Sequence, residues 1–365
     1  MEKAAVLLSA VVAAMSLTAE ETVLKTAFDG KFWVGAALNE RQIMGRNPEE
    51  RKLIAAQFNS ITAENCMKPV ALQPREGEFN WRTADRFVDF GVENKMKVIG
   101  HCLVWHSQLP RWMNEKLKGQ CTRDEAVDIM KRHVQAVVGH FKGRVRGWDV
   151  VNEAIEENGS LRRTVWLNTI GEDYLLLAFR FAHEADPEAE LYYNEYNTEN
   201  PRKADRMVKL VKDLRAAGLR IDALGMQTHV RLDHPRLSAY AASMRKFVDA
   251  GVKLMVTELD VSVLPAAWRM SADVSRNVAY DAKFNPWPDG KLPDTVQKRL
   301  SDRYAELFRL FLEYSSSLDR VTFWGVSDRD SWLNNFPVRG RTDYPLPFDR
   351  SLHPKPLVKA IEELL

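Results

Sequence analysis

The chain has 365 residues, 45% of them hydrophobic and 28% charged, which is enough for one large domain with a sizeable core. Its 52 basic and 50 acidic residues leave a formal net charge of +2, and no long run of either sign occurs. This balance argues against nucleic acid or an anionic membrane as the main partner. Three cysteines are too few for a disulfide framework. Buried free thiols are expected, and a bridge between Cys66 and Cys102 is the alternative.

Residues 1–19 have the pattern of a secretory signal peptide. Lys3 gives a positive start, the run from Ala4 to Met15 is apolar apart from Ser9, and small residues follow. The run is too short for a transmembrane span, and a frayed amphipathic helix is the alternative. We expect export to the periplasm or outside the cell, no membrane partner after cleavage, and one catalytic domain over residues 20–365.

After this segment, strand and helix patterns alternate along the whole chain. The expected strands are 32–38, 60–65, 97–104, 146–153, 189–196, 223–230, 253–261 and 320–328. The expected helices are 48–58, 82–95, 123–143, 173–186, 201–218, 238–251, 294–317 and 355–365. The strands are apolar on both faces, as a buried parallel sheet requires. Eight such units predict an α/β fold of the (β/α)8 TIM-barrel type. A doubly wound open sheet is the alternative, but no glycine-rich phosphate loop follows the first strand.

One connection is unusually long. Residues 262–293 follow the seventh expected strand and contain Trp268, Phe284 and Trp287. Long loops in compact domains are often functional. The segment either reshapes a site at this face of the barrel or is a surface excursion held by its own aromatic residues, and both interpretations stay open.

Two glutamates stand at the polar ends of apolar strands. The stretch Trp148–Ala154 ends in Asn152 and Glu153, and residues 254–260 place Glu258 in a similar position. Strand ends from different βα units converge on one face of a barrel, so the two carboxylates can meet. A facing pair is what glycoside hydrolysis requires, and proximity pushes the two pKa values apart. The alternative is two ordinary charges, each paired at a strand end.

Further polar and indole groups occupy the other strand ends. They are Glu64, Asn65, Lys68, His101, Trp105, His106, Asn194, Tyr196, Gln227, His229, Trp324 and Trp332. Hydrogen-bonding groups mixed with indoles suit a polyhydroxylated ligand. No His-x-His and no compact His, Asp and Glu cluster occurs, so neither a metal nor another cofactor is expected. No Gly-x-Ser-x-Gly motif supports a serine nucleophile.

Together these residues resemble glycoside hydrolase family 10, the retaining endo-β-1,4-xylanases. The resemblance runs from about Phe32 to the C-terminus. It is carried by Thr62-Ala63-Glu64-Asn65 with Lys68, Gly100-His101, Leu103 to Gln108, Trp148 to Glu153, Tyr193-Asn194 with Tyr196-Asn197, Gly225-Met226-Gln227 with His229, Thr257 to Asp260, and Trp324-Gly325-Val326 with Asp328, Ser331 and Trp332.

The resemblance implies a role for each site residue. Glu153 would be the acid/base and Glu258 the nucleophile, with their carboxyl groups about 5–5.5 Å apart in a retaining enzyme. Asn152 would hold the sugar 2-hydroxyl, and Asp260 would orient His229 against Glu258. Substrate would be bound by Glu64, Asn65, Lys68, His101, Trp105, Asn194, Tyr196, Gln227, His229, Trp324 and Trp332. The implied ligands are xylan and xylo-oligosaccharides, and we expect a monomer.

One departure from the family pattern is Cys66, where relatives commonly carry a polar residue. Strand alternation would turn Cys66 away from the sugar, so little effect is expected. A β-1,4-glucanase and a non-catalytic sugar-binding barrel are the competing functions. The first would depend on whether a 5-hydroxymethyl group fits near Glu64, Asn65 and Trp324, and the second would require the loss of Glu153 or Glu258.

Overall fold

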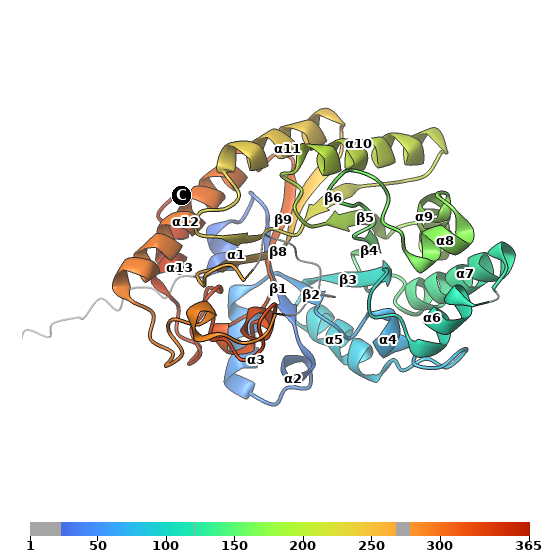
Figure 1. The fold of residues 1–365 in the computed structure, drawn as a ribbon. Helices are drawn as coiled ribbons and strands as arrows, with labels where there is room; N and C mark the ends of the chain where they lie inside the picture. Colours follow the sequence, from blue (N-terminus) through green and yellow to red (C-terminus); the bar gives the residue numbers. More distant parts are fainter. Residues whose placement is uncertain (1–22, 120, 268–277) are drawn as a thin grey trace, which may run out of the picture.

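The computed structural model describes residues 23–119, 121–267 and 278–365. The expected signal peptide at 1–19 and Trp268 lie outside these residues. In the part described, parallel strands form a closed ring with helices around it, as Figure 1 shows. The strands are β1 Trp33–Leu38, β2 Ser60–Ala63, β3 Lys97–Val104, β4 Gly147–Asn152, β5 Glu190–Glu195, β6 Ala223–Met226, β7 His229–Arg231, β8 Lys253–Ser262 and β9 Leu318–Phe323.

The ring closes as a (β/α)8 barrel, which confirms the predicted fold. The strands follow one another in the order β6-β5-β4-β3-β2-β1-β9-β8-β7, and β6 also pairs with β8. Both β6 and β7 pair in parallel with β8, so together they fill one position of the barrel. The sixth expected strand, 223–230, is therefore present but interrupted at Gln227 and Thr228. The partners Met226↔Val256 and His229↔Asp260 show that the register shifts by one residue across this break.

Thr228 explains the break. It has φ +66°, a conformation that a β-branched residue rarely adopts. The Thr228 hydroxyl hydrogen-bonds the Met226 carbonyl oxygen at 2.9 Å and contacts the hydroxyl of Tyr240. The last expected strand also ends early, because β9 stops at Phe323 and Asp328–Asp330 form a 3-10 turn.

Helices surround the barrel. They are α1 Leu24–Ala27, α2 Glu40–Ile43, α3 Pro48–Gln57, α4 Pro69–Leu72, α5 Arg82–Glu93, α6 Arg111–Lys118, α7 Arg123–His140, α8 Val165–Ile170, α9 Tyr174–Ala185, α10 Pro201–Ala216, α11 Leu237–Asp249, α12 Asp294–Glu313 and α13 Pro356–Glu362. Five of those described, α2, α3, α7, α8 and α10, have a side-chain cap at the N-terminus. The short helices α1, α2, α4, α6 and α8 were not predicted. Asn47 and Asn200 cap α3 and α10, each directly before a proline at the first helical position.

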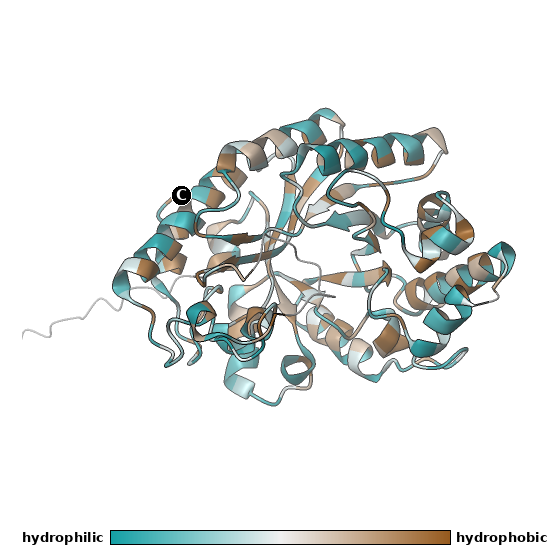
Figure 2. Ribbon diagram, viewed as in Figure 1, coloured by the Kyte–Doolittle hydropathy of each residue, from teal (hydrophilic) through white to brown (hydrophobic). Residues whose placement is uncertain are grey.

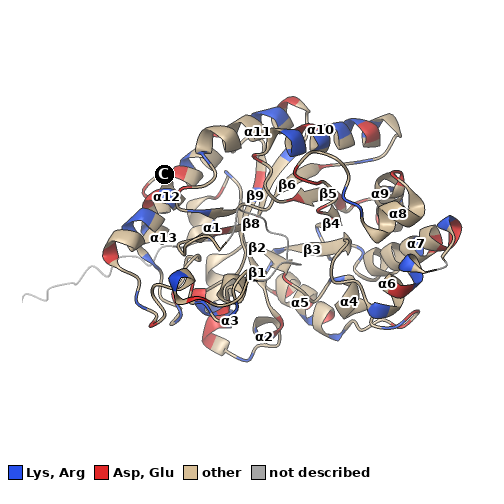
Figure 3. Cartoon of the chain, in the orientation of Figure 1, with Lys and Arg blue, Asp and Glu red and all other residues tan. Residues whose placement is uncertain are grey.

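Hydrophobic residues fill the space between the strands and the helices, and many charged residues lie on the outer faces of the helices. Figure 2 shows hydrophobic and hydrophilic sides on the outer helices, and Figure 3 shows Lys and Arg interspersed with Asp and Glu on α7, α10 and α12. A separate small cluster inside the barrel consists of Ile99, Tyr192, Ala223 and Met255. These four residues come from β3, β5, β6 and β8, so the interior is packed and the polar strand ends are supported from below.

The connection after β8 is anchored to the segment after β9. Val278 bridges Val338, the Asn285 side chain accepts a hydrogen bond from the Thr342 amide at 2.9 Å, and Tyr344 donates to the Trp287 carbonyl at 2.6 Å. Phe284 belongs to the 3-10 helix η1 Ala282–Phe284, and Trp287 packs against the main core. The described part of the connection is therefore docked on the barrel, partly through its own aromatic residues.

The cysteines are free thiols, as expected. Cys66 and Cys102 are buried and Cys121 is half-buried, so the alternative Cys66–Cys102 bridge is not formed. Burial raises the pKa of Cys66 to about 12. Cys66 lies beyond the end of β2, so the strand alternation used to orient it does not apply, and it packs in the hydrophobic core. Within the described ranges, no helix is long and apolar enough to cross a membrane.

Candidate active site

The end of β4 directs Glu153 out of the strand. The pairing of β4 with β5 shifts between Asp149 and Val151, and Glu153 then adopts φ +57°. This left-handed conformation is unfavourable for a residue with a side chain. It ends the strand sharply, and the Glu153 amide donates a 2.9 Å hydrogen bond to the Asn194 carbonyl. A local bulge and turn therefore set the direction of this carboxyl group.

A hollow of about 560 Å³ opens where the strand ends converge. It is lined by Glu64, Asn65, Lys68, His101, Trp105, Gln108, Asn152, Glu153, Gln227, His229, Glu258, Trp324 and Trp332. Residues from six strand ends or the loops after them thus meet around one space. The lining includes both predicted carboxylates and all but two of the predicted substrate-binding residues. Gln108 was not among those candidates, although it follows Trp105 in the same loop.

Glu153 is buried and held by two donors. Trp105 Nε1 donates to Oε2 at 2.9 Å, and Gln227 Nε2 donates to Oε1 at 2.9 Å. Burial is the main reason that the pKa of Glu153 is raised above its ordinary value, and the negative charge of Glu258 adds to this effect. The two hydrogen bonds oppose the increase without reversing it. This carboxyl group therefore keeps its proton to a higher pH than an ordinary glutamic acid, as a general acid requires.

Glu258 is equally buried, but its surroundings favour the charged form. Asn194 Nδ2 donates to Oε1 at 2.7 Å, and His229 Nε2 lies 3.1 Å from Oε2. Burial alone would raise the pKa of Glu258. The hydrogen bond from His229, the attraction of His101 and His229, and the hydrogen bond from Asn194 together lower it below the ordinary value. The pKa values of the two carboxyl groups in this hollow are thus shifted in opposite directions.

His229 is charged because Asp260 stands behind it. His229 Nδ1 lies 3.0 Å from Asp260 Oδ2, and Trp332 Nε1 donates to the same oxygen at 2.7 Å. Burial would lower the pKa of His229, but the charge and hydrogen bond of Asp260 and the contact with Glu258 raise it to about 10. Asp260 thus contacts the ring nitrogen of His229 on the side away from Glu258.

Asn194 and Tyr196 lie behind the lining. Asn194 is fully buried, and its Nδ2 also donates to Asn152 Oδ1 at 2.9 Å. Its Oδ1 accepts from the Thr257 hydroxyl at 2.7 Å. The Tyr196 hydroxyl accepts a hydrogen bond from Arg162. Asn194 therefore contacts the side chains of Asn152 and Glu258 from outside the hollow, and Tyr196 contacts Arg162.

Another side of the hollow carries a chain of polar groups from the loop after β2. Lys68 Nζ donates to Asn65 Oδ1 at 2.9 Å, and Asn65 Nδ2 donates to Glu64 Oε1 at 3.1 Å. Asn65 thus links Glu64 to Lys68. Lys68 Nζ also lies 5.0 Å from the centre of a Trp105 ring. His101 Nδ1 lies 2.8 Å from Asp149 Oδ2, which fixes its ring at the floor of the hollow.

A second hollow of about 570 Å³ shares His229 and Trp332 with the first. Its wall includes Leu264, Pro265 and Phe336, the last of which stacks on Trp332 with ring centroids 4.8 Å apart. The first residues of the long connection after β8 therefore border this side of the site. That placement brings the described start of the connection close to the cleft.

A family model for glycosyl hydrolase family 10 matches residues 23–364. The chain belongs to this family. Among similar proteins, endo-1,4-β-xylanase A of Xylanibacter ruminicola is 45% identical over 346 residues, which are 94% of this chain and 94% of that one.

Solved structures agree with this family 10 assignment. A family 10 endoxylanase from a sugarcane soil metagenome is 39% identical with a TM-score of 0.90, covering 94% of this chain and 100% of the other. An intracellular xylanase of Thermoanaerobacterium saccharolyticum, solved as a variant in complex with xylotriose, is 34% identical with a TM-score of 0.80 and covers 94% and 99%.

This family 10 chain has no evident metal centre in the ranges 23–119, 121–267 and 278–365. No group of three or more His, Cys, Asp or Glu side chains in those ranges is arranged to hold a metal ion. By residue type, the possible ligands were His101, His106, His229 and Glu258. His101 contacts Asp149, His229 contacts Glu258 and Asp260, and Glu258 also accepts a hydrogen bond from Asn194.

Three charged residues below Glu153 escaped prediction. Arg162 donates from Nε to the Glu153 carbonyl at 3.0 Å, and Glu195 and Lys203 form a buried pair. Arg162 and Lys203 lie in a loop and a helix without a motif that marks them. Glu195 stands between the two residues predicted on β5, and this adjacency was the available signal.

Proposed function

We propose that this protein is an endo-acting β-1,4-xylanase that hydrolyses xylan with retention of anomeric configuration. The observation that carries the proposal is the pair of buried carboxyl groups in one hollow, with the pKa of Glu153 raised and that of Glu258 lowered. Retaining glycosidases need one protonated and one ionised carboxyl group at the bond that is cleaved. The similarity to named endo-1,4-β-xylanases over almost the full chain supports xylan as the substrate.

The proposed reaction has two steps. Glu258 attacks the anomeric carbon while Glu153 donates its proton to the leaving oxygen, and a covalent glycosyl-enzyme forms. Glu153, now a carboxylate, then takes a proton from the water that attacks the same carbon and releases Glu258. Gln227 and Trp105 hold the two oxygens of Glu153 in both steps, since each donates to a different oxygen.

Polar groups of the hollow are proposed to bind the sugars. Asn152 would hold the 2-hydroxyl of the sugar attached to Glu258, and Glu64 and Asn65 would bind the next sugar on the non-reducing side. The groups proposed to line the point of cleavage are Lys68, His101, Trp105, Gln227, His229, Trp324 and Trp332. Asn194 and Tyr196 were predicted to bind substrate. From their positions we propose that Asn194 acts through Asn152 and Glu258, and Tyr196 through Arg162.

We further propose that residues 1–19 direct export and are removed, leaving a monomeric catalytic domain over 20–365. The support is the apolar run after Lys3 and the family match over 23–364. Mass spectrometry of the protein recovered from its native compartment tests this directly. A mature N-terminus near residue 20 is expected, and an intact Met1 would refute it.

The function is tested by a product profile on xylan and on cellulose, with Glu258→Ala beside the wild type. We expect internal cleavage of xylan into xylo-oligosaccharides, little release from cellulose, and loss of activity in the variant. Proton NMR of the first products should show the β-anomer before mutarotation. An α-anomer as first product contradicts retention, and normal activity of Glu258→Ala contradicts the nucleophile assignment.

A further inference from the structure

A buried ion pair lies directly beneath the turn that carries Glu153. Glu195 at the end of β5 and Lys203 in α10 are both fully buried, and Lys203 Nζ lies 2.9 Å from Glu195 Oε1. Neither residue is part of the lining of the active-site hollow. A buried charge pair is costly to desolvate and is weak evidence for added stability. Its position next to the proposed acid/base therefore calls for a different explanation.

Glu195 satisfies the backbone immediately after Glu153. Its Oε2 accepts from the Ile155 amide at 3.0 Å and from the Tyr193 hydroxyl at 2.7 Å. The Tyr193 oxygen in turn accepts from the Ala154 amide at 2.9 Å. The two consecutive amides after Glu153 are thus both tied to the Glu195 carboxylate. The Ile155 amide bonds it directly, and the Ala154 amide bonds it through the Tyr193 hydroxyl.

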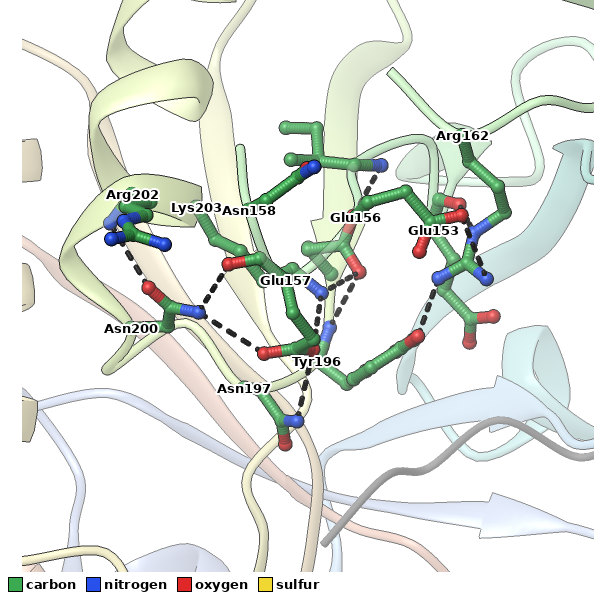
Figure 4. A network of polar contacts seen from close by, with 12 residues as sticks. Glu153, Glu156, Glu157, Asn158, Arg162, Tyr196, Asn197, Asn200, Arg202 and Lys203 are labelled. Atoms are coloured by element: carbon green, nitrogen blue, oxygen red, sulfur yellow. Dashed lines mark hydrogen bonds and ion pairs between the residues drawn. The ribbon is translucent and has the colours of Figure 1, made fainter. Parts of the chain in front are cut away.

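The opposite side of the same turn is held by Arg162. Arg162 Nε donates to the Glu153 carbonyl at 3.0 Å and also contacts the Tyr196 hydroxyl, as Figure 4 shows. Lys203 Nζ lies 3.7 Å from the centre of the Tyr196 ring and 3.4 Å from Glu157 Oε1. Lys203 therefore contacts both Glu195, beneath the turn, and Tyr196 and Glu157, beside it.

Such support matches the conformation of Glu153. A left-handed residue persists where the surrounding structure over-determines it, and Glu153 has φ +57°. Proton transfer requires the carboxyl group within hydrogen-bond reach of the leaving oxygen, and small displacements are costly for the rate. The pair is thus placed to control the position of the acid through the backbone of residues 153–155.

We propose that Glu195 and Lys203 are positioning residues for the acid/base Glu153. This inference rests on the proposed function and adds to it a requirement outside the substrate-binding hollow. The pair acts on the proton-transfer step, so its removal should affect reactions that need the proton more than reactions that do not. A purely structural role would lower both kinds of reaction equally.

The test variant is the double substitution Glu195→Gln/Lys203→Met. It removes both charges at similar volume, so no lone buried charge remains. The glutamine amide replaces one acceptor oxygen by a donor nitrogen, so either the Ile155 amide on Oε2 or the Tyr196 amide, which donates to Oε1 at 3.1 Å, loses its acceptor. Tyr193→Phe is a milder second variant, because it removes only the hydroxyl group between Glu195 and the Ala154 amide.

A matched control exists elsewhere in the barrel. Asp328 and Lys355 form another buried pair with a 2.9 Å contact, and they bond the Leu346 amide and the Tyr344 carbonyl instead of the Glu153 turn. Asp328→Asn/Lys355→Met should therefore change thermal stability without changing the relative rates on different leaving groups. Circular dichroism and thermal melting establish that each variant is folded.

The readout is kcat/KM on aryl β-xylobiosides with good and poor leaving groups, because this quantity reports the cleavage step. For Glu195→Gln/Lys203→Met we expect a fall of roughly ten- to a hundredfold on the poor leaving group and less than about threefold on the good one. Tyr193→Phe should show the same split at smaller size, and it decides the matter if the double variant does not fold. Equal losses on both substrates, or no loss in a folded variant, would overturn the inference.

Glu153→Ala measured beside these variants separates the two proposals. If Glu153→Ala shows the split and the Glu195 and Lys203 variants do not, only the positioning role is wrong. If Glu153→Ala itself shows no dependence on the leaving group, the acid role in the proposed function is wrong.

Discussion

Replacement of His229 by glutamine should move the acidic limb of the pH profile to higher pH. The ionised form of Glu258 is the proposed nucleophile, so kcat/KM should fall as the pH drops through the pKa of Glu258. His229, with a pKa of about 10, is charged across the usual assay range and helps to keep the pKa of Glu258 low. Without that charge the burial of Glu258 dominates, and the carboxylate takes up a proton at a higher pH.

The size of the effect follows from the geometry. At an effective dielectric constant of about 20, Coulomb's law gives roughly 5 kcal/mol between His229 Nε2 and Glu258 Oε2 at 3.1 Å. Glutamine can keep a hydrogen bond, worth about 1.5–3 kcal/mol when one partner is charged. The remaining loss of about 2–3 kcal/mol corresponds to a fall in kcat/KM of roughly one to two orders of magnitude on the acidic limb.

The assay is kcat/KM for an aryl xylobioside across the pH range in which the enzyme stays folded. His133→Gln is the matched control, because His133 is another buried histidine, is hydrogen-bonded to Gln73 at 2.9 Å, and lies in α7 outside the active-site hollow. Its acidic limb should coincide with that of the wild type. An unshifted acidic limb in folded His229→Gln would refute the electrostatic role of His229. A shift to lower pH would mean that His229 raises the pKa of Glu258 instead of lowering it.

Four further predictions concern the acid, two glycines and the chemistry. Glu153→Ala should lower kcat/KM for poor leaving groups by roughly 10²–10⁴-fold and far less for good ones, and equal losses in steady-state assays would count against the acid role. Gly100→Ala should destabilise the protein in urea by about 1–3 kcal/mol, because the added Cβ would lie 2.1 Å from Trp148 Cε3. Gly139→Ala in α7, where nothing lies within 4 Å, should instead stabilise it by about 0.5–1 kcal/mol. EDTA should leave xylan hydrolysis unchanged, and a loss restored by added metal would refute the metal-free mechanism.

The strands and their polar ends were predictable because burial on both faces leaves a clear sequence pattern. Apolar runs that end in Asn152-Glu153 or in Glu258 have few explanations other than a site at the mouth of a barrel. The break between β6 and β7 was not predictable, because Thr228 gives no local sign that it will adopt a positive φ. The helices after β1, β2, β3 and β4, namely α2, α4, α6 and α8, have only 4, 4, 8 and 6 residues, which is too short to show a clear helical period.

The residues that line the hollow could be predicted better than the residues that hold those lining residues in place. Residues such as Trp105 and Gln227 follow strands directly, so the topology brings them to one place. Arg162 and Lys203 reach the turn at Glu153 from a loop and from α10, and such long-range contacts leave no mark in the nearby sequence. The same reason explains why Asn194 was placed correctly at a strand end but turned out to lie beneath the lining.

Of the two proposed catalytic carboxyl groups, Glu258 lies within β8 and Glu153 directly follows the last residue of β4, so both are held by strands of the ring. Strands of a closed core open only with the whole molecule, whereas exposed connections open at low cost. Heating should therefore leave the catalytic geometry intact until the barrel itself melts. We expect exchange of the long connection after β8 to alter the second hollow, which Leu264 and Pro265 line, and to leave Glu153 and Glu258 in place. Substrate range and thermal endurance are thus separable targets for engineering in this enzyme.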